Sequence, residues 1–185
     1  MMSVRPLFLR DFKLGNMPRP QVAIIDYGVG NLLSVLRAVE YCGGKAFCSS
    51  DAVAIGKADH VILPGVGAYS NAMEALRSLA LVDAIQNIAS SGNPLLGICL
   101  GMQLLLDDSE EFGFSFGLGL IPGKVKAIPN LSTDGERLKR PHIGWNGVIP
   151  TVGSSWDNTI MKGSKKADSL YFVHSYMAVP DHPSA

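Results

Sequence analysis

The chain has 185 residues, of which 47% are apolar and 17% charged, and its formal net charge is zero. This length and composition suit one compact domain with a substantial core, and they argue against a disordered chain. The balanced charge and the lack of a basic run argue against a nucleic-acid partner. No apolar stretch approaches the roughly 20 residues needed to cross a bilayer, so we expect no membrane partner.

Residues 1–20 differ from the rest because they mix basic and apolar side chains. They lack the long apolar block and the small-residue cleavage site of a secretory signal. A basic transit peptide is an alternative, but Asp11 and the short length argue against it. We therefore expect a disordered N-terminal extension over residues 1–20 and a folded domain over residues 21–185.

Strands are predicted by short apolar runs at residues 22–25, 61–63 and 94–98, with a weaker one at residues 46–48. Between them, apolar residues at helical spacing predict a helix from Leu32 that Gly43 and Gly44 end. A second, longer helix is predicted to continue to residue 89 behind a capping arrangement of Asn71 and Glu74.

This alternation of strands and helices is typical of a parallel sheet covered by helices. After Asp107 the pattern changes: residues 121–128, 169–173 and those around Trp145 predict strands, whereas residues 112–119 show no clear period. We expect an antiparallel or mixed β-rich extension of the sheet. Ligands of such sheets gather beyond the carboxyl ends of the parallel strands, where the glycine-rich turns of this chain lie.

Three cysteines, an odd number without metal-ligand spacing, predict a reducing compartment, no disulfide framework and no metal site. Cys99 stands apart because Gly97 and Gly101 bracket it between a predicted strand and a predicted helix over residues 102–106. Such a turn exposes a nucleophile, and a helix N-terminus favours the thiolate. For Cys42 and Cys48 we expect the ordinary role of a buried core cysteine.

The turn Pro-Gly-Val-Gly at residues 64–67 follows the neighbouring predicted strand. Backbone amides in a turn with small side chains can stabilise an oxyanion, although most such turns only connect elements. Its place beside the cysteine turn makes it a candidate oxyanion turn. The glycine-rich residues 26–31 invite comparison with phosphate loops, but they lack the third glycine and the lysine of those motifs, so we do not expect a phosphate site there.

The segment Gly-Ile-Cys-Leu-Gly-Met-Gln at residues 97–103 resembles the nucleophile motif of class I, triad-type glutamine amidotransferases. More narrowly, the chain resembles the glutaminase subunit of imidazole glycerol phosphate synthase over residues 22–176. The motifs that carry this resemblance, besides the cysteine motif, are residues 25–31, 64–68, 117–123, 141–146 and 171–176.

The resemblance implies a flavodoxin-like, three-layer α/β/α amidotransferase domain with a mostly parallel sheet and a β-rich extension. It implies hydrolysis of L-glutamine to glutamate and ammonia without a cofactor. The ammonia would pass to a (β/α)8-barrel synthase subunit, which forms imidazole glycerol phosphate in histidine biosynthesis and releases an aminoimidazole ribotide. A cytoplasmic heterodimer is implied with it.

The resemblance also implies roles for individual residues. Cys99 would attack the carboxamide and form a γ-glutamyl thioester, while backbone amides near Val66 and Leu100 would hold the oxyanion. The residues implied to bind glutamine are Gly67, Gln103 and Ser175. The residues implied to face the synthase barrel are Asn31, His142, Trp145 and Asn146.

One part of the family pattern is absent from this sequence. The family takes its general base and orienting carboxylate from a late His-x-Glu motif, and none of the four histidines, His60, His142, His174 and His182, fits it. We therefore expect that the C-terminal part of the family domain is missing. We expect this chain to be inactive or severely impaired as a glutaminase, and poorly soluble.

Three alternatives stay open. The chain could be a non-catalytic subunit that docks on a synthase and binds glutamine. It could supply ammonia to another acceptor synthase, because the partner chooses the acceptor. A stand-alone cysteine protein of flavodoxin-like architecture, such as a chaperone or hydrolase, is disfavoured by residues 141–146, since a stand-alone protein has no use for a docking segment.

Overall fold

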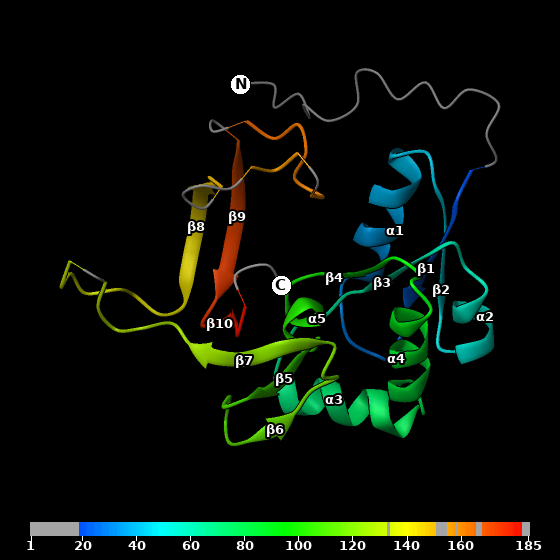
Figure 1. Ribbon diagram of the computed structural model, residues 1–185, viewed down its shortest axis with the longest axis horizontal. Helices are drawn as coiled ribbons and strands as arrows, with labels where there is room; N and C mark the ends of the chain where they lie inside the picture. The colour runs from blue at the N-terminus through cyan, green and yellow to red at the C-terminus, as the bar shows by residue number, and fades with distance from the viewer. Residues whose placement is uncertain (1–18, 133, 151–154, 158, 166–167, 183–185) are drawn as a thin grey trace. The chain divides into compact units, whose positions relative to one another are not determined.

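The computed structural model of the protein describes residues 19–132, 134–150, 155–157, 159–165 and 168–182 (Figure 1). Most of the expected N-terminal extension therefore lies outside the described residues. The chain forms two compact units: Ala127–Met177 is unit 2, and the residues before and after it form unit 1. Within the described ranges, no helix is long and apolar enough to cross a membrane.

The first sheet of unit 1 is parallel, as predicted. It contains β1 (Gln21–Ile25), β2 (Lys45–Ser49), β3 (His60–Leu63) and β4 (Leu95–Gly97) in the order β2-β1-β3-β4. Every pairing between these neighbours is parallel. Ile24, Ile25 and Leu63 are fully buried, so the apolar runs that predicted β1 and β3 do form the core of this sheet.

Helix α1 (Leu32–Tyr41) packs through Leu32, Val35, Leu36 and Val39 against the buried core of β1 and β3, which confirms its predicted apolar face. Helix α2 (Ala52–Gly56) was not predicted, because five residues are too few to show helical periodicity. Its N-terminus is capped by the Asp51 carboxylate, which accepts a hydrogen bond of 2.9 Å from the Val53 N–H.

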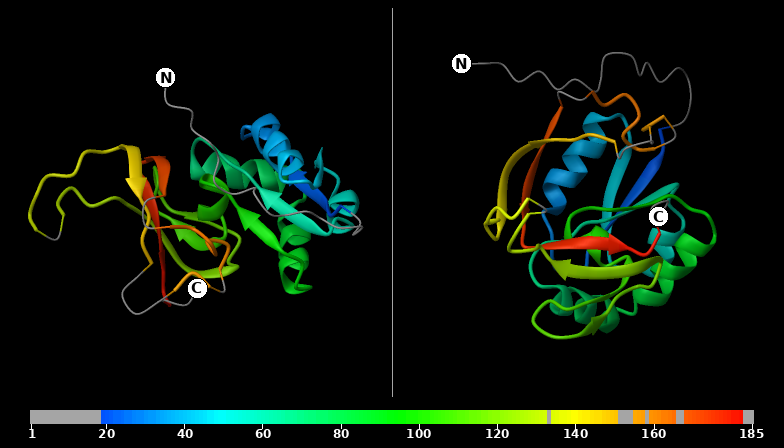
Figure 2. Two further views of the ribbon diagram at one scale, coloured as in Figure 1. Left: turned by 90° about the horizontal axis from the view of Figure 1, so that it is seen from above. Right: turned by 60° about the vertical axis from the view of Figure 1, so that its left-hand side comes forward.

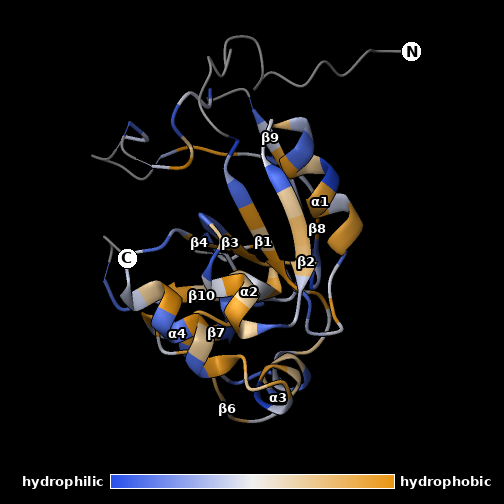
Figure 3. Ribbon diagram, turned by 90° about the vertical axis from the view of Figure 1, so that its right-hand side faces the viewer, coloured by the Kyte–Doolittle hydropathy of each residue, from blue (hydrophilic) through white to orange (hydrophobic). Residues whose placement is uncertain are grey.

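The predicted long helix is wrong in one respect, because two helices replace it: α3 (Tyr69–Ser78) and α4 (Val82–Ser90). The ribbons of both helices carry orange and blue segments, so each helix mixes apolar and polar residues (Figure 3). The break is at Ala80, whose φ of 54° lies in the left-handed region. The Ala80 N–H bonds the Arg77 carbonyl and the Leu81 N–H bonds the Leu76 carbonyl, the pattern that ends many helices.

The predicted capping arrangement of Asn71 and Glu74 is also wrong. Helix α3 begins three residues earlier, because its N-cap is Ala68, whose side chain makes no capping hydrogen bond. A carboxylate from elsewhere in the chain takes that role: Glu111 Oε2 accepts a hydrogen bond of 2.7 Å from the Tyr69 N–H. No local pattern could predict this contact, because the two residues are 42 positions apart.

The predicted β-rich extension forms a second hydrogen-bonded sheet. Its strands are β5 (Leu106–Ser109), β6 (Ser115–Phe116), β7 (Ile121–Ala127) and β10 (Tyr176–Pro180), in the order β10-β7-β5-β6. Strand β5 is parallel to β7 and antiparallel to β6, so the pairing is mixed, as expected. Figure 2 shows β10 beside β7. The strand β10 itself was not predicted.

Unit 2 contains the antiparallel pair β8 (His142–Gly147) and β9 (Ser169–His174), which lie side by side in Figure 1. Both were predicted. His142 pairs with His174, and Trp145 pairs with Tyr171. Because side chains alternate along a strand, these two pairs lie on opposite faces of the β8–β9 ribbon.

Replacing Ala80 with glycine should stabilise the protein. Glycine adopts a positive φ without the steric cost that alanine meets, and Ala80 is exposed, so little packing is lost. We expect Ala80→Gly to raise the free energy of unfolding by about 0.5–1 kcal/mol in urea titrations. Ala75→Gly, inside α3, is the matched control and should lower it by about 1 kcal/mol. Equal effects of the two variants would contradict this account of the break.

Candidate active site

Cys99 lies in the turn between β4 and a short helix, α5 (Leu100–Gln103), and its side chain is exposed. Its backbone has φ 55° and ψ −116°, a conformation that residues with side chains rarely adopt. A strained residue at a strand-to-helix turn, with its side chain exposed, is the geometry of a nucleophile elbow. The predicted turn between a strand and a helix is present at Cys99, while its role as a nucleophile stays a prediction.

The glycines on both sides of Cys99 are required by close packing. A Cβ on Gly97 would lie 2.5 Å from the Met102 Cα, and a Cβ on Gly101 would overlap the Leu63 carbonyl oxygen. No side chain fits at either position without moving the backbone. The bracketing glycines thus let α5 fold back tightly against β3 and β4.

The helix predicted over residues 102–106 is wrong in its bounds. Helix α5 starts at Leu100 and is four residues long, whereas Leu106 already belongs to β5. The Met102 and Gln103 N–H groups bond the Cys99 carbonyl at 3.0 and 3.2 Å. The Gly101 N–H likewise bonds the Ile98 carbonyl at 3.0 Å. One turn carries little macrodipole, so the dipole of a long helix is not what the elbow offers to a developing negative charge.

The candidate oxyanion turn, residues 64–67, directly contacts the elbow. A Cβ on Gly65 would lie 2.8 Å from the Gly101 nitrogen and 3.0 Å from the Leu100 Cβ. The Ile98 N–H also donates to the Leu63 carbonyl at 3.0 Å, which joins the two segments just before the turns begin. Val66 and Gly67, with φ 94° at Gly67, lie on the exposed part of this turn.

A third loop, residues 26–31, meets the same edge of the sheet. A Cβ on Gly30 would lie 3.4 Å from the Pro64 Cβ. Tyr27, which sequence reasoning did not single out, is buried, and its hydroxyl donates a 2.7 Å hydrogen bond to the Pro64 carbonyl. Burial raises the pKa of the Tyr27 hydroxyl, and the charge of the Cys99 thiolate raises it further. The expectation that glycine-rich turns meet at the carboxyl ends of the strands is confirmed.

Glu111 is a second residue that sequence reasoning missed. Its bond to the Tyr69 N–H holds the start of α3, and α3 follows the oxyanion turn after only Ala68. The turn is therefore bounded by a fixed helix on one side and by β3 on the other.

The residues implied to bind glutamine fall in both units. In unit 1, Gln103 is the last residue of α5 and is buried. In unit 2, Ser175 lies between β9 and β10, and its carbonyl accepts a 2.9 Å hydrogen bond from the Ile128 N–H. Their roles toward glutamine stay predictions. His60 begins β3, at the end opposite the oxyanion turn, as expected.

The residues implied to face a partner have neighbours within the chain. The Asn31 side chain caps α1 by accepting a 3.2 Å hydrogen bond from the Ser34 N–H. His142 lies 3.3 Å from both the His174 and Asn146 side chains. Trp145 lies on the other face of the ribbon and is 72% exposed. The three predicted contacts on β8 therefore divide between two faces.

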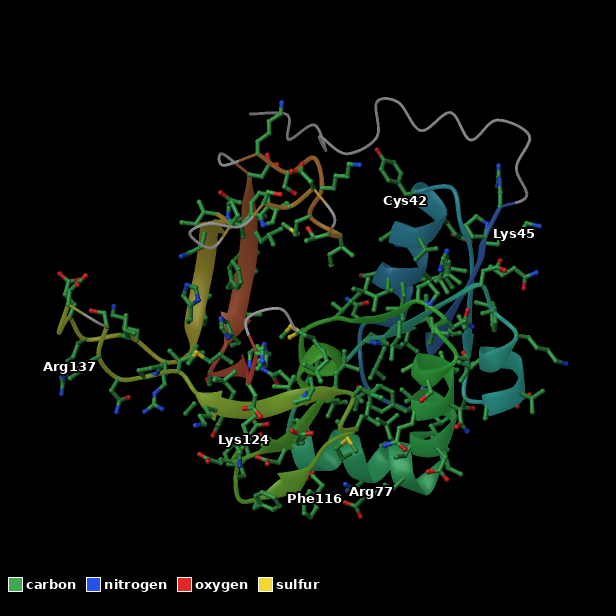
Figure 4. The ribbon with its side chains drawn as sticks, in the orientation of Figure 1. Cys42, Lys45, Arg77, Phe116, Lys124 and Arg137 are labelled. Carbon is green, nitrogen blue, oxygen red and sulfur yellow. The ribbon has the colours of Figure 1, made fainter. Side chains whose placement is uncertain are left out.

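In the part of the chain that the structure describes, no group of three or more His, Cys, Asp and Glu residues could hold a metal ion. Cys42 and Cys48 are exposed rather than buried, so the expectation of core cysteines is wrong for both. Figure 4 shows Cys42 at the end of α1. It is the C-cap of that helix, a position that faces solvent.

Comparisons of this sequence with family models and with curated proteins agree on one family. Residues 23–185 match the model of the class-I glutamine amidotransferase family. The chain is 48% identical over 163 residues to imidazole glycerol phosphate synthase subunit HisH 1 of Legionella pneumophila (strain Lens), covering 88% of this chain and 76% of that protein. It is 43% identical over 164 residues to the HisH subunit of Syntrophotalea carbinolica, covering 88% and 78%.

A solved structure supports the fold. The crystal structure of a glutamine amidotransferase superimposes with a TM-score of 0.55 at 16% sequence identity, and the match covers 68% of this chain and 62% of that one. The flavodoxin-like α/β architecture expected from the sequence is thus confirmed.

The contact between elbow and sheet can be tested at Gly101. Because an added Cβ would overlap the Leu63 carbonyl, Gly101→Ala should lower the free energy of unfolding by about 1–3 kcal/mol in urea titrations. Gly56→Ala, in α2, is the matched control because no atom lies within 4 Å of the added Cβ. A Gly101→Ala protein as stable as the control would contradict the close approach.

Proposed function

Because the chain belongs to the class-I glutamine amidotransferase family, we propose that it is the glutaminase subunit of an imidazole glycerol phosphate synthase. Subunits of this kind hydrolyse L-glutamine to glutamate and ammonia, and we place this one in the cytoplasm. The ammonia then passes to a (β/α)8-barrel subunit that forms imidazole glycerol phosphate in histidine biosynthesis. The identity to HisH subunits and the ordered motifs of the sequence support this proposal.

The observation that carries the proposal is the contact between the Cys99 elbow and the turn of residues 64–67. The Cys99 sulfur attacks the carboxamide carbon of glutamine, and the carbonyl oxygen becomes an oxyanion. The Val66 and Leu100 N–H groups donate hydrogen bonds to it. The C–N bond then breaks, ammonia leaves with an added proton, and a γ-glutamyl thioester remains. Water cleaves the thioester to glutamate and restores the thiol.

Glutamine recognition is assigned to the residues around this contact. Gly67 lies on the exposed part of the turn, next to Val66, where a bound substrate can reach its backbone. Gln103 lies one helical turn beyond Cys99, at the end of α5, and its side chain is buried there. In this proposal Gly67 and Gln103 bind the amino-acid part of glutamine, and the family resemblance implies the same role for Ser175.

Two proton transfers are required, one from the thiol and one to the departing ammonia, and both need a general acid–base group. The 185 residues contain no His-x-Glu motif. We therefore propose that a polypeptide of these residues alone attacks glutamine slowly and turns it over at a negligible rate.

Cys99 should react selectively with a chloroketone analogue of glutamine, from which the sulfur displaces chloride. We expect glutamine to slow this labelling and Cys99→Ser to abolish it, as measured by intact-protein mass spectrometry. Cys42→Ser is the matched control, since Cys42 is also exposed, and it should leave the labelling unchanged. Labelling that glutamine does not slow would contradict the proposed substrate.

Turnover is measured separately as glutamate release. This polypeptide should release glutamate at no more than about one-thousandth of the rate of a glutaminase with a complete catalytic triad. The reason is that general acid–base catalysis raises such rates by about 100- to 10,000-fold. Release at ordinary rates that Cys99→Ser abolishes would contradict the proposed impairment.

The docking surface is assigned to one face of the β8–β9 ribbon. Ile143, Trp145, Tyr171 and Val173 share this face, and each is more than half exposed. Trp145 and Tyr171 lie 5.4 Å apart between ring centres, which makes a preformed aromatic anchor for a partner. The acceptor of the ammonia is chosen by whichever synthase binds here.

Trp145→Ala should weaken binding of the barrel subunit by roughly 30-fold, the effect of losing a central aromatic anchor. Titration calorimetry with the purified barrel subunit measures this directly. Val53→Ala, which removes an exposed apolar side chain of α2, is the control and should leave the affinity unchanged. An unaltered affinity of the Trp145 variant would overturn the assignment of this face.

A further inference from the structure

A buried phenol with no assigned role lies beneath the candidate oxyanion turn. Tyr27 follows β1, and its side chain is only 3% exposed. Its hydroxyl donates to the Pro64 carbonyl at 2.7 Å, across 37 positions of sequence. A Cβ on Gly65 would lie 2.7 Å from the same hydroxyl oxygen, so the phenol also contacts the next residue of the turn.

This hydrogen bond constrains the turn because a peptide unit is planar. When the Pro64 carbonyl is held, the plane of the Pro64–Gly65 peptide and the direction of the Gly65 N–H are held with it. The turn needs such a constraint, since Gly65 and Gly67 offer the backbone more conformations than other residues do. Val66 lies between these glycines, and its N–H has to point at the oxyanion.

We propose that Tyr27 is a positioning residue for glutamine hydrolysis: its hydroxyl fixes the Pro64–Gly65 peptide, and so limits where the next peptide of the oxyanion turn, which carries the Val66 N–H, can lie. This inference rests on the proposed function. Tyr27 does not touch the substrate, because it is buried under Pro64 and Gly65. It acts on the tetrahedral oxyanion through the backbone of the turn.

The test uses two reagents that differ in whether an oxyanion forms. The chloroketone analogue of glutamine places a ketone where the carboxamide binds, and the sulfur adds to this ketone to form a tetrahedral oxyanion before chloride is displaced. Iodoacetamide instead alkylates the sulfur by direct displacement of iodide. Removing the Tyr27 hydroxyl should slow the first reaction and spare the second. A residue that only stabilised the fold would not change the ratio of the two rates.

We expect Tyr27→Phe to lower the rate of Cys99 labelling by the chloroketone about tenfold, the effect of one lost hydrogen bond. Its rate with iodoacetamide should stay within about twofold of the wild-type value. The matched control is Tyr69→Phe, because Tyr69 is also fully buried and its hydroxyl has no hydrogen-bond partner among the described residues. It should change neither rate.

A second experiment measures the conformational freedom of the oxyanion turn itself. Amide hydrogen exchange at Val66 should become faster in Tyr27→Phe than in the wild type, while exchange in β1 stays the same. Wild-type rates with both reagents, or an equal fall in both, would overturn the positioning role. If the wild-type protein shows no glutamine-sensitive labelling, the proposed function fails first and this inference fails with it.

Discussion

The close approach of the Gly101 backbone to the Leu63 carbonyl is the constraint on which the rest of the site depends. It brings α5 against the ends of β3 and β4, and only a residue without a Cβ permits it. The strained backbone of Cys99 follows, because the chain must leave β4 and reach α5 within a single tight turn. The same approach brings Gly65 against Leu100, so the two candidate oxyanion donors lie on segments that already contact each other.

The sequence predicted those parts of the fold that have local signals. The strands β1, β3 and β4 were found because buried parallel strands are continuous apolar runs, and α1 because its apolar face repeats at helical spacing. The division between α3 and α4 was missed because Ala80 adopts a positive φ without being a glycine or asparagine. Helix α2 and strand β10 are too short or too irregular in composition to show a period.

In the candidate site too, only the residues with a local sequence signal could be predicted. Cys99 and residues 64–67 stood out because glycines at fixed spacing have a mechanical meaning. Tyr27 and Glu111 did not, since each acts through one hydrogen bond to backbone that is remote in sequence. The division of His142 and Trp145 between two faces follows from strand alternation once the register is known, but the bounds of β8 are needed first. The resemblance supplied the chemistry, and the geometry decided which residues share a surface.

The anchoring of the oxyanion turn has a consequence for any attempt to move this chemistry to another protein. The seven-residue cysteine motif is the most recognisable part of the site, yet it contains neither Tyr27 nor Glu111. The residues that hold the candidate site come from the loop after β1 and from the segment after β5, so this site is spread over most of unit 1. A graft of residues 97–103 onto a foreign strand and helix would carry the thiol and Leu100, and would leave behind the turn of residues 64–67 with the contacts that hold it. The candidate site therefore depends on the packing of several segments and not on the seven-residue motif alone.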